Sequence, residues 1–472
     1  MMPPKLVTLT IDSQVITVPE GMLVVDAARK AGVDIPVFCY HPKMEPVGMC
    51  RMCLVEVGRP VMDRTTGQPV LEPDGTPRLG FGPKLETACT TPVSEGMVVI
   101  TSSPKVKSAQ RDVLEFLLTS HPLDCPVCDK GGECPLQNLT MRFGPGESRF
   151  EYSDKKHLAK HVPLGELIYL DRERCIQCAR CTRFAHEVVD DPVIGFYQRG
   201  RSLEIQTHST PGFDSIFSGN TTDICPVGAL TTVDFHFGAR PWEMKYAASI
   251  CNHCPVGCNL TINVRREARS GGKNVIKRIM PRQNEQVNET WICDKGRMVY
   301  QYTESPQRLV MPLVRKNGEL VETDWEDALK LAAEKLHNPL VLAGGRLSNE
   351  DLFNLARLAS EQQGRAILYS AMAGGDLVRQ VGVGTGTNLK DMGRGDAILV
   401  VASDLHQEAP LWWLRVKQAA QRGATLIVLG GRETRLETYA TYVIRHPYGS
   451  AAETLAKFLP GSDLSSQDCS IS

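Results

Sequence analysis

Hydrophobic and polar residues alternate near the N-terminus. In residues 7–18, VTLTIDSQVITV, the alternation runs on both sides of a central turn, which predicts a β-hairpin. Residues 22–32, MLVVDAARKAG, predict a short helix ending at Gly32, because glycine commonly follows a helix. A second helix is predicted over residues 104–121, PKVKSAQRDVLEFLLTSH, whose apolar positions have helical spacing. The chain therefore opens as a mixture of sheet and helix.

The pattern changes from about residue 308. Residues 324–336, DWEDALKLAAEKL, predict a helix with a capping Asp or Thr. The apolar runs PLVLAGG, AILYSA, AILVVASD and ATLIVLGG then alternate with the helical stretches EDLFNLARLASEQQ and PLWWLRVKQAAQRG. Strands that alternate with helices predict an α/β domain with a parallel sheet.

Composition narrows the function classes. The chain has 472 residues, 42% hydrophobic and 23% charged, with a net charge of -1. This length predicts three to five domains, and the charge gives no indication of nucleic-acid binding or of a basic membrane-binding face. The apolar runs are far shorter than the ~18–20 residues of a membrane helix, and the N-terminus lacks a signal-peptide pattern. We therefore expect a cytoplasmic protein.

Sixteen cysteines add candidate chemistry, and fifteen of them precede residue 294. The cytosol keeps thiols reduced, so clustered cysteines there indicate metal binding rather than disulfides. The first set has the spacing C-x10-C-x2-C, with a fourth member further on. The set comprises Cys39, Cys50, Cys53 and Cys89.

Thiolates are the ligands that iron–sulfur clusters need, and a loop around a two-iron cluster commonly supplies three of them. A hairpin, a helix and then a cysteine loop resemble the opening of a plant-type ferredoxin, a β-grasp sheet. Zinc is the alternative, but zinc sites usually have two knuckles and this set has one. Residues 58–87, rich in Gly, Pro and Asp, predict an inserted surface hairpin or loop before Cys89.

A bacterial ferredoxin core, C-x2-C-x2-C, lies in RCIQCARC. The chain has no second triad beside it, so the cysteine of DICPVGAL closes the same cluster. This set comprises Cys175, Cys178, Cys181 and Cys225. A further set follows in CNHCPVGC and WICDKGR, and zinc remains an alternative there. It comprises Cys251, Cys254, Cys258 and Cys293. We expect His253, between two of them, to face solvent.

Three cysteines remain in HPLDCPVCDKGGEC, namely Cys125, Cys128 and Cys134. A cubane needs a fourth ligand, and imidazole can replace thiolate in iron–sulfur centres. His121 is the favoured fourth ligand, with the alternative that it caps the preceding helix. Cys469 is the other candidate, in a polar tail. A neutral imidazole makes the cluster less negative and raises its potential.

No pattern for a nucleophile, a dinucleotide fingerprint or a P-loop is found in the sequence. The chemistry that remains is one-electron transfer between redox partners. The cysteine order, and the stretches GMCRMCLVEV, HPLDCPVCDKGGECPLQN, RCIQCARCTRF and DICPVGALT, closely resemble the large iron–sulfur subunit of respiratory complex I, NADH–quinone oxidoreductase. The resemblance extends over residues 5–460.

This resemblance implies a [2Fe-2S] cluster on the first set and a [4Fe-4S] cluster on each of the other three, including His121 as a ligand. It implies a relay from a flavin-bearing NADH-oxidising subunit toward quinone-side iron–sulfur subunits of the peripheral arm, with only indirect contact to the membrane arm. The complex is expected at the inner face of the cell membrane, and the fourth cluster is expected to stand apart from the main electron path.

The expected architecture is α+β and multidomain. It comprises a [2Fe-2S] ferredoxin-like β-grasp (5–103), a His/Cys [4Fe-4S] module (104–144), a [4Fe-4S] ferredoxin-like module (164–240), a [4Fe-4S] module of molybdopterin-oxidoreductase type (244–300) and a partial molybdopterin-oxidoreductase-like α/β domain (308–460). Ser370 is the one candidate metal ligand in that last domain, which has no cysteine between residues 294 and 468. We expect no molybdopterin.

Two other electron-transfer classes share these front modules. One is the iron–sulfur alpha subunit of an NAD-dependent formate dehydrogenase, and the other is the electron-input module of an NAD-linked hydrogenase. The first usually carries two ferredoxin triads and a metal-binding Cys or selenocysteine, and both are missing here. The second tends to lack the α/β region or to carry hydrogenase cysteine motifs, and none follows residue 293. A zinc-stapled assembly scaffold is the non-enzymatic alternative.

Overall fold

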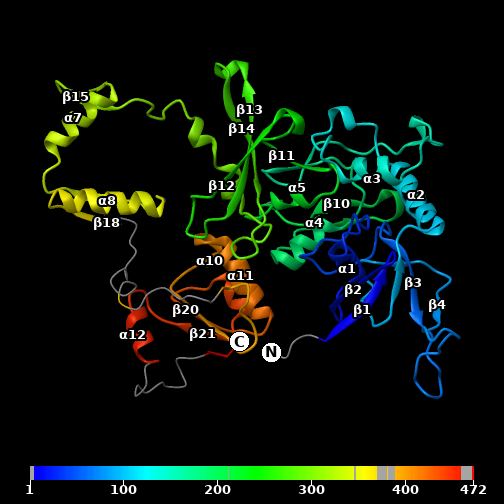
Figure 1. Cartoon of the computed structure of the whole chain (residues 1–472). Coiled ribbons are helices and arrows are strands. Elements are labelled where there is room, and N and C mark those ends of the chain that lie inside the picture. The colour runs from blue at the N-terminus through cyan, green and yellow to red at the C-terminus, as the bar shows by residue number, and fades with distance from the viewer. Residues whose placement is uncertain are drawn as a thin grey trace. The chain divides into compact units, whose positions relative to one another are not determined.

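The computed structural model describes residues 5–210, 212–344, 347–368, 380, 388–458 and 470–471. By its internal contacts the chain divides into two compact units. Figure 1 labels the helices and strands that they contain. The first unit comprises Met1–Lys245 and Val264–Lys277. The second comprises Tyr246–Asn263 and Arg278–Ser472.

The first unit opens with the predicted hairpin, in which β1 (Leu6–Ile11) pairs antiparallel with β2 (Gln14–Pro19). The sheet has the order β2-β1-β6-β3-β4, and β5 pairs with β3. Its other strands are β3 (Leu54–Pro60), β4 (Leu79–Phe81), β5 (Glu86–Thr87) and β6 (Val98–Ile100). The predicted helix is α1 (Val24–Lys30), which buries its valines and alanines in the core beneath the sheet. The hairpin and the helix are thus confirmed.

The Gly- and Pro-rich insertion forms a surface hairpin, as predicted. Isolated bridges join Met62 to Pro69 and Leu71 to Pro77, and all three residues of β4 are exposed. The insertion therefore extends from the edge of the sheet and adds little to its core.

Helix α2 (Pro104–Leu118) is three residues shorter than the prediction. Ser103 caps its start by accepting a bond from the Val106 N–H at 3.3 Å. At its end, the Thr119 hydroxyl donates to the carbonyl of Phe116, and the Lys155 ammonium donates to that of Leu118. These two donors occupy carbonyls that a helix end leaves without partners, so His121 lies beyond the helix.

Short elements carry the rest of the first unit. The helical ones are η1 (Cys125–Val127), α3 (Pro135–Phe143), η2 (Tyr152–Asp154), α4 (Arg180–Arg183), η3 (Phe184–Val188), η4 (Gly200–Ser202), α5 (Asn220–Ile224), η5 (Pro241–Glu243) and η6 (Ala268–Ser270). The strands form two small sheets with the orders β11-β8-β7 and β10-β9. They are β7 (Val162–Pro163), β8 (Ile168–Leu170), β9 (Ile194–Tyr197), β10 (Glu204–Thr207) and β11 (Leu230–Thr232).

A three-stranded sheet comes next along the chain. Its strands, in the order β12-β13-β14, are β12 (Lys245–Ile250), β13 (Asn259–Glu267) and β14 (Lys273–Pro281). The elements that follow are α6 (Asp294–Met298), η7 (Gln301–Glu304), β15 (Leu313–Lys316) and β16 (Glu319–Glu322).

The α/β part of the second unit contains the predicted parallel strands. The strands β17 (Leu340–Ala343) and β18 (Arg365–Leu368) pair in parallel, as do β19 (Ala397–Val401), β20 (Thr425–Gly430) and β21 (Tyr442–Arg445). The short β22 (Ser470–Ile471) is antiparallel to β21. The helices are α7 (Trp325–Lys335), α8 (Asn349–Glu361), α10 (Leu405–Glu408), α11 (Pro410–Gln421), η8 (Arg435–Tyr439) and α12 (Ala451–Ala456).

The parallel strands form two sheets in the described part of the chain, where the sequence pattern predicted one. Helix α11 buries eight of its side chains, whereas α8 buries only Ala359 and α7 buries none. Large apolar residues of the β17–β18 layer, including Trp325, Leu340 and Phe353, are more than half exposed. Helix burial is what stabilises such layers, so the β19–β21 layer is the better packed.

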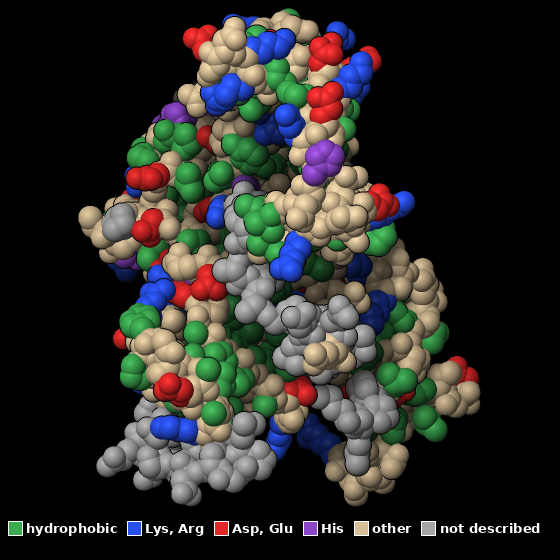
Figure 2. Space-filling view, turned by 90° about the vertical axis from the view of Figure 1, so that its left-hand side faces the viewer, with side chains coloured by type: hydrophobic (Ala, Val, Ile, Leu, Met, Phe, Trp, Pro, Cys, Tyr) green, Lys and Arg blue, Asp and Glu red, His purple; other side chains and the backbone are tan. Residues whose placement is uncertain are grey.

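Surface charge agrees with the neutral composition. Lys and Arg lie interspersed with Asp and Glu over the face shown in Figure 2. Among the described residues, every helix is too short or too polar to cross a bilayer.

Ile11→Ala is expected to destabilise the first sheet by about 2–5 kcal/mol, because it removes buried methyl groups and leaves a cavity. Ile11 is fully buried on β1, whereas Val15 on β2 is 73% exposed. Hydrogen–deuterium exchange of the β1 and β2 amides in the full chain measures the effect. Val15→Ala is the control, and equal exchange in the two variants would contradict the core assignment.

Candidate metal centres

The first cysteine set forms one buried group of thiols. Cys39 follows α1, Cys50 and Cys53 precede β3, and Cys89 follows β5. The Cys39 N–H donates to the Cys50 sulfur at 3.5 Å. Bonds from the thiols of Cys50 and then Cys89 lower the pKa of Cys39, and a bond from Cys89 lowers the pKa of Cys53. The structure thus brings all four predicted residues together.

The second set surrounds a glycine loop in the same unit. Cys125 starts η1 and is exposed, while Cys128 and Cys134 are buried. Burial, and then nearby charges that include Cys125, raise the pKa of Cys128, and burial raises that of Cys134. The loop needs its glycines, because a Cβ on Gly131 would lie 2.8 Å from the carbonyl oxygen of Cys125.

Gly228, just after Cys225, packs directly on this loop. A Cβ at this position would lie 2.1 Å from the sulfur of Cys128, far inside van der Waals contact. The Cys134 sulfur is also close to the third set's loop, 3.7 Å from the carbonyl oxygen of Pro226. The loops of the second and third sets therefore pack against each other.

His121 has a buried ring nitrogen that is available to a ligand. Its Nδ1 is buried and has no hydrogen-bond partner in the described part of the chain, although buried polar atoms are nearly always paired. Burial, and then the charge of Arg174, lower the pKa of His121 to about 4, so the imidazole is neutral at pH 7. The carbonyls that a cap would serve are bonded to Thr119 and Lys155. A soft metal ion would satisfy this nitrogen.

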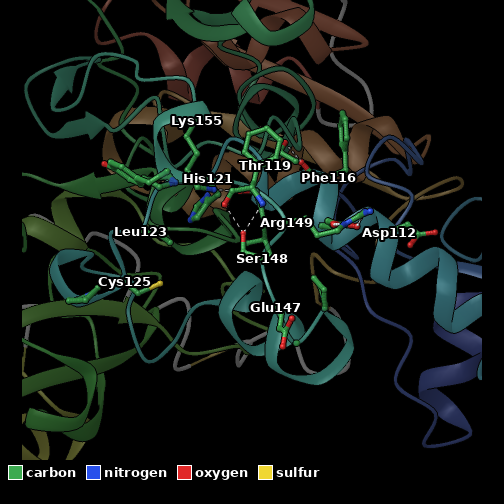
Figure 3. Close-up of a pocket in the computed structure, with 18 residues that line it drawn as sticks. Asp112, Phe116, Thr119, His121, Leu123, Cys125, Glu147, Ser148, Arg149 and Lys155 are labelled. Carbon is green, nitrogen blue, oxygen red and sulfur yellow. Dashed lines mark hydrogen bonds and ion pairs between the residues drawn. The ribbon is translucent and has the colours of Figure 1, made fainter.

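A cavity of about 900 Å³ opens beside His121 and Cys125 (Figure 3). Apolar side chains make up most of its wall, among them Phe116, Leu123 and Phe150. In the second set, Cys128 thus packs against the loop of Gly228, whereas Cys125 faces the apolar cavity.

A network of buried charges ties the second loop to the third. Arg174, which precedes Cys175, contacts Asp124, which precedes Cys125, at 2.9 Å. Lys160 contacts the same carboxylate at 2.7 Å and that of Glu173 at 2.5 Å. The Arg174 side chain is only 6% exposed, so these charges depend on one another for their stability.

All four cysteines of the third set line one small apolar cavity. Three of its members precede or begin α4, and Cys225 ends α5. Burial raises the pKa of Cys175 and of Cys178 to about 12, and it raises the pKa of Cys181 well above its usual value. The Gln177 N–H donates to the Cys175 sulfur at 3.4 Å. These thiols are protonated at neutral pH unless a cation stabilises the thiolates.

Burial also lowers the pKa of Arg180, and thiolates of two cysteine sets oppose that shift. The opposing thiolates are those of Cys178, Cys225, Cys39 and Cys50. The guanidinium is therefore within electrostatic range of the first and third sets together.

The fourth set lies in the second unit. Cys251 follows β12, and its N–H donates to the Cys258 carbonyl at 2.8 Å. A Cβ on Gly296 would lie 3.3 Å from the Cys251 sulfur and 3.8 Å from that of Cys293. Burial, then the charge of Cys293, raise the pKa of Cys258, and Cys254 acts in the same direction. All four members are again together.

His253 is half-buried rather than fully solvent-facing. Its Nε2 lies 3.1 Å from the Val299 carbonyl oxygen, to which it donates, and its ring meets the edge of Tyr302. In the described residues, no three His, Cys, Asp or Glu side chains converge as they would on a single ion. Cys469 and Ser370 lie outside the described residues.

Sequence reasoning missed three arginines near these sets, Arg174, Arg180 and Arg183. The only signal in the sequence was their position within RERCIQCARCTRF, which does not reveal what a long side chain reaches.

Five family models match the chain in succession. They are a 2Fe-2S iron-sulfur cluster binding domain (residues 4–104), the NADH-ubiquinone oxidoreductase-G iron-sulfur binding region (110–149), the ferredoxin-like domain of NADH-quinone oxidoreductase subunit 3 (165–231), the molybdopterin oxidoreductase Fe4S4 domain (244–305) and molybdopterin oxidoreductase (308–468). The expected succession of domain types is thus confirmed.

Curated relatives match nearly the whole chain. The G subunit of NADH-quinone oxidoreductase from Streptomyces coelicolor is 40% identical over 98% of this chain and 53% of its own length. Subunit 3 of the Thermus thermophilus enzyme is 39% identical over 88% of this chain and 53% of its own length. The chain thus spans about half the length of the curated relatives it matches. A chain of a crystal structure of NAD+-reducing [NiFe]-hydrogenase in the H2-reduced state aligns with 49% of this chain and 90% of its own, at 28% identity and a TM-score of 0.40.

Arg174→Ala is expected to destabilise the second and third loops by about 1.5–3 kcal/mol, because it removes charge-assisted hydrogen bonds to Asp124 and Asp171 and leaves Lys160 as their remaining ion-pair partner. Hydrogen–deuterium exchange over residues 121–134 measures the loss. The control is Arg357→Ala, which breaks an exposed i,i+4 pair with Glu361 and should change nothing measurable. Unchanged exchange in the Arg174 variant would show that the network does not hold the loop.

Proposed function

We propose that this chain is the electron-relay subunit of an NADH-quinone oxidoreductase, because 88–98% of the chain matches about half of the G subunit or subunit 3 of such enzymes. Electrons would enter from a flavin-bearing NADH-oxidising subunit and leave toward quinone-side iron–sulfur subunits of the peripheral arm. The observation that carries the proposal is the gathering of fifteen cysteines, ten of them buried, into four separate groups in a chain of iron–sulfur domain families.

Each group would hold one cluster. The first would hold a [2Fe-2S] cluster on Cys39, Cys50, Cys53 and Cys89. The others would each hold a [4Fe-4S] cluster, on His121, Cys125, Cys128 and Cys134; on Cys175, Cys178, Cys181 and Cys225; and on Cys251, Cys254, Cys258 and Cys293. The domain bounds 5–103, 104–144, 164–240, 244–300 and 308–460 belong to the same proposal.

His121 completes the second group. Its unpaired, neutral Nδ1 is suited to a soft cation, and no thiol of the described residues is left over to act as a fourth ligand there. Replacing one thiolate with an imidazole makes the site less negative, which raises the potential at which it accepts an electron.

Iron–sulfur clusters supply one-electron chemistry without any reacting side chain. The protein's own residues bury the thiolates, exclude water and donate N–H groups to sulfur, as Cys39 and Gln177 do. Burial and N–H···S bonds are levers on the potential. The backbone of the loops would therefore tune each site as well as hold it.

The α/β domain has no assigned redox role in this proposal, and we infer that it binds no molybdopterin. The protein would act in the cytoplasm at the inner face of the cell membrane, held there by the other subunits of its complex. Its contact with the membrane arm would be indirect.

Anaerobically prepared full chain is expected to contain about fourteen iron atoms, the sum for one [2Fe-2S] and three [4Fe-4S] clusters. Iron and acid-labile sulfide are counted, and electron paramagnetic resonance (EPR) of the dithionite-reduced chain should show both cluster types. Cys178→Ala is the matched control and should lose about four irons. About four metal ions per chain, all zinc, would instead support the scaffold alternative.

His121→Cys is expected to keep the second cluster and lower its midpoint potential, because a thiolate adds one negative charge. A redox titration followed by EPR measures the shift. His253→Cys, beside the fourth set, is the control and should leave the second cluster's potential unchanged. If His121→Cys also leaves that potential unchanged, His121 is not a ligand.

A further inference from the structure

Two arginines of α4 reach from the third cysteine set to the first. Arg180 lies between Cys178 and Cys181 in the chain, and its guanidinium donates to the carbonyl of Tyr40, the residue after Cys39. The same group donates to the carbonyl of Ile224, the residue before Cys225, at 3.0 Å. One planar group thus binds the backbone beside ligands of both proposed clusters.

Arg183 repeats the contact one turn further along the helix. Its guanidinium donates to the carbonyl of Cys39 itself and to that of Glu45, within the same first loop. The residues joined are about 140 positions apart in the chain. The first loop is therefore fastened to α4 at three carbonyls, and α4 itself carries Cys181.

Resting on the function proposed above, we propose that Arg180 and Arg183 are positioning residues that fix the separation of the first and third clusters and, through the charge of Arg180, raise the reduction potential of both. No cysteine motif assigns these residues a role. They act through the loops that carry the ligands, not by binding iron.

The choice of arginine suits this task. A guanidinium presents several donors in a rigid plane, so it can hold two carbonyls in one geometry, and its charge persists at every accessible pH. In the described part of the chain Arg180 forms no ion pair with a carboxylate, and its Nε is buried without a hydrogen-bond partner. Its charge is therefore not cancelled locally and favours the added electron of a reduced cluster.

Electron transfer between clusters requires a fixed separation and matched potentials. Interactions between buried charges are weakly screened by salt, so one cation between two clusters acts on both at once. Arg180 thereby affects both the distance between the first and third clusters and the difference in potential that drives electron transfer between them.

The test uses the full chain, loaded with iron anaerobically, and the variants Arg180→Gln and Arg180→Lys. Arg357→Gln is the control, because it removes the same charge from α8 in the other unit, where the arginine pairs with Glu361. EPR-monitored redox titration gives the potentials. Relaxation enhancement of the [2Fe-2S] signal by the neighbouring reduced [4Fe-4S] cluster reports their separation.

Arg180→Gln is expected to lower both potentials, so that the ratio of reduced to oxidised cluster at a fixed potential falls about tenfold, equivalent to about 59 mV for one electron. Arg180→Lys keeps the charge and should shift the potentials less, but it should weaken the relaxation enhancement because one ammonium cannot reproduce the planar bridge. Arg357→Gln should leave every signal unchanged.

Unaltered potentials and relaxation in an Arg180→Gln chain of normal iron content would overturn this inference and leave the proposed function intact. An unaltered chain that holds no iron–sulfur clusters would overturn the proposed function itself. If Arg180→Gln does not load iron, the positioning role is tested with Arg180→Lys and Arg183→Gln. Unchanged relaxation enhancement of the [2Fe-2S] signal in both variants would exclude that role.

Discussion

The structure depends on one constraint, namely that a bare thiolate is unfavourable away from water. Burial raises the pKa of Cys128, Cys175 and Cys258 above that of a free thiol, so these loops are poor hosts for negative charge on their own. Bound iron would supply the compensating positive charge, and metal binding would then contribute to folding. Short helices, tight turns and glycine contacts surround each set. They hold the sulfurs close together, although these sulfurs would repel one another as thiolates.

The three cysteine loops of the first unit are joined by side chains rather than by a shared hydrophobic core alone. The Arg174–Asp124 pair joins the second loop to the third, and Arg180 and Arg183 join the first loop to the third. Buried contacts of charged side chains such as these add little net stability but penalise alternative arrangements. In an electron relay, a fixed arrangement has more value than additional stability, since the spacing between redox centres determines the transfer.

The sequence was informative wherever a local rule decides the structure. The alternation around Asp12 predicted the hairpin. Spacing predicted three of the cysteine sets, and the second set was the three cysteines that remained; the structure gathers the cysteines of each set. The end of α2 could not be read in the same way, because it is decided by Lys155, 37 residues away. The arginine contacts cross about 140 residues, and the two parallel sheets of the second unit depend on which helices become buried. Tertiary contacts decide these features, and periodicity does not encode them.

The close packing of Gly228 against the Cys128 sulfur has a consequence for how such a protein can be rearranged. The glycine belongs to the ferredoxin-like segment, yet the volume that it leaves is occupied by a sulfur of the preceding segment. Neither segment can therefore be transferred to another protein alone. Removing the ferredoxin-like segment would expose Cys128, and a protein that received the Cys128 segment would need a glycine at the point that faces this sulfur. Recombination that respects this fit must exchange the pair as a single block.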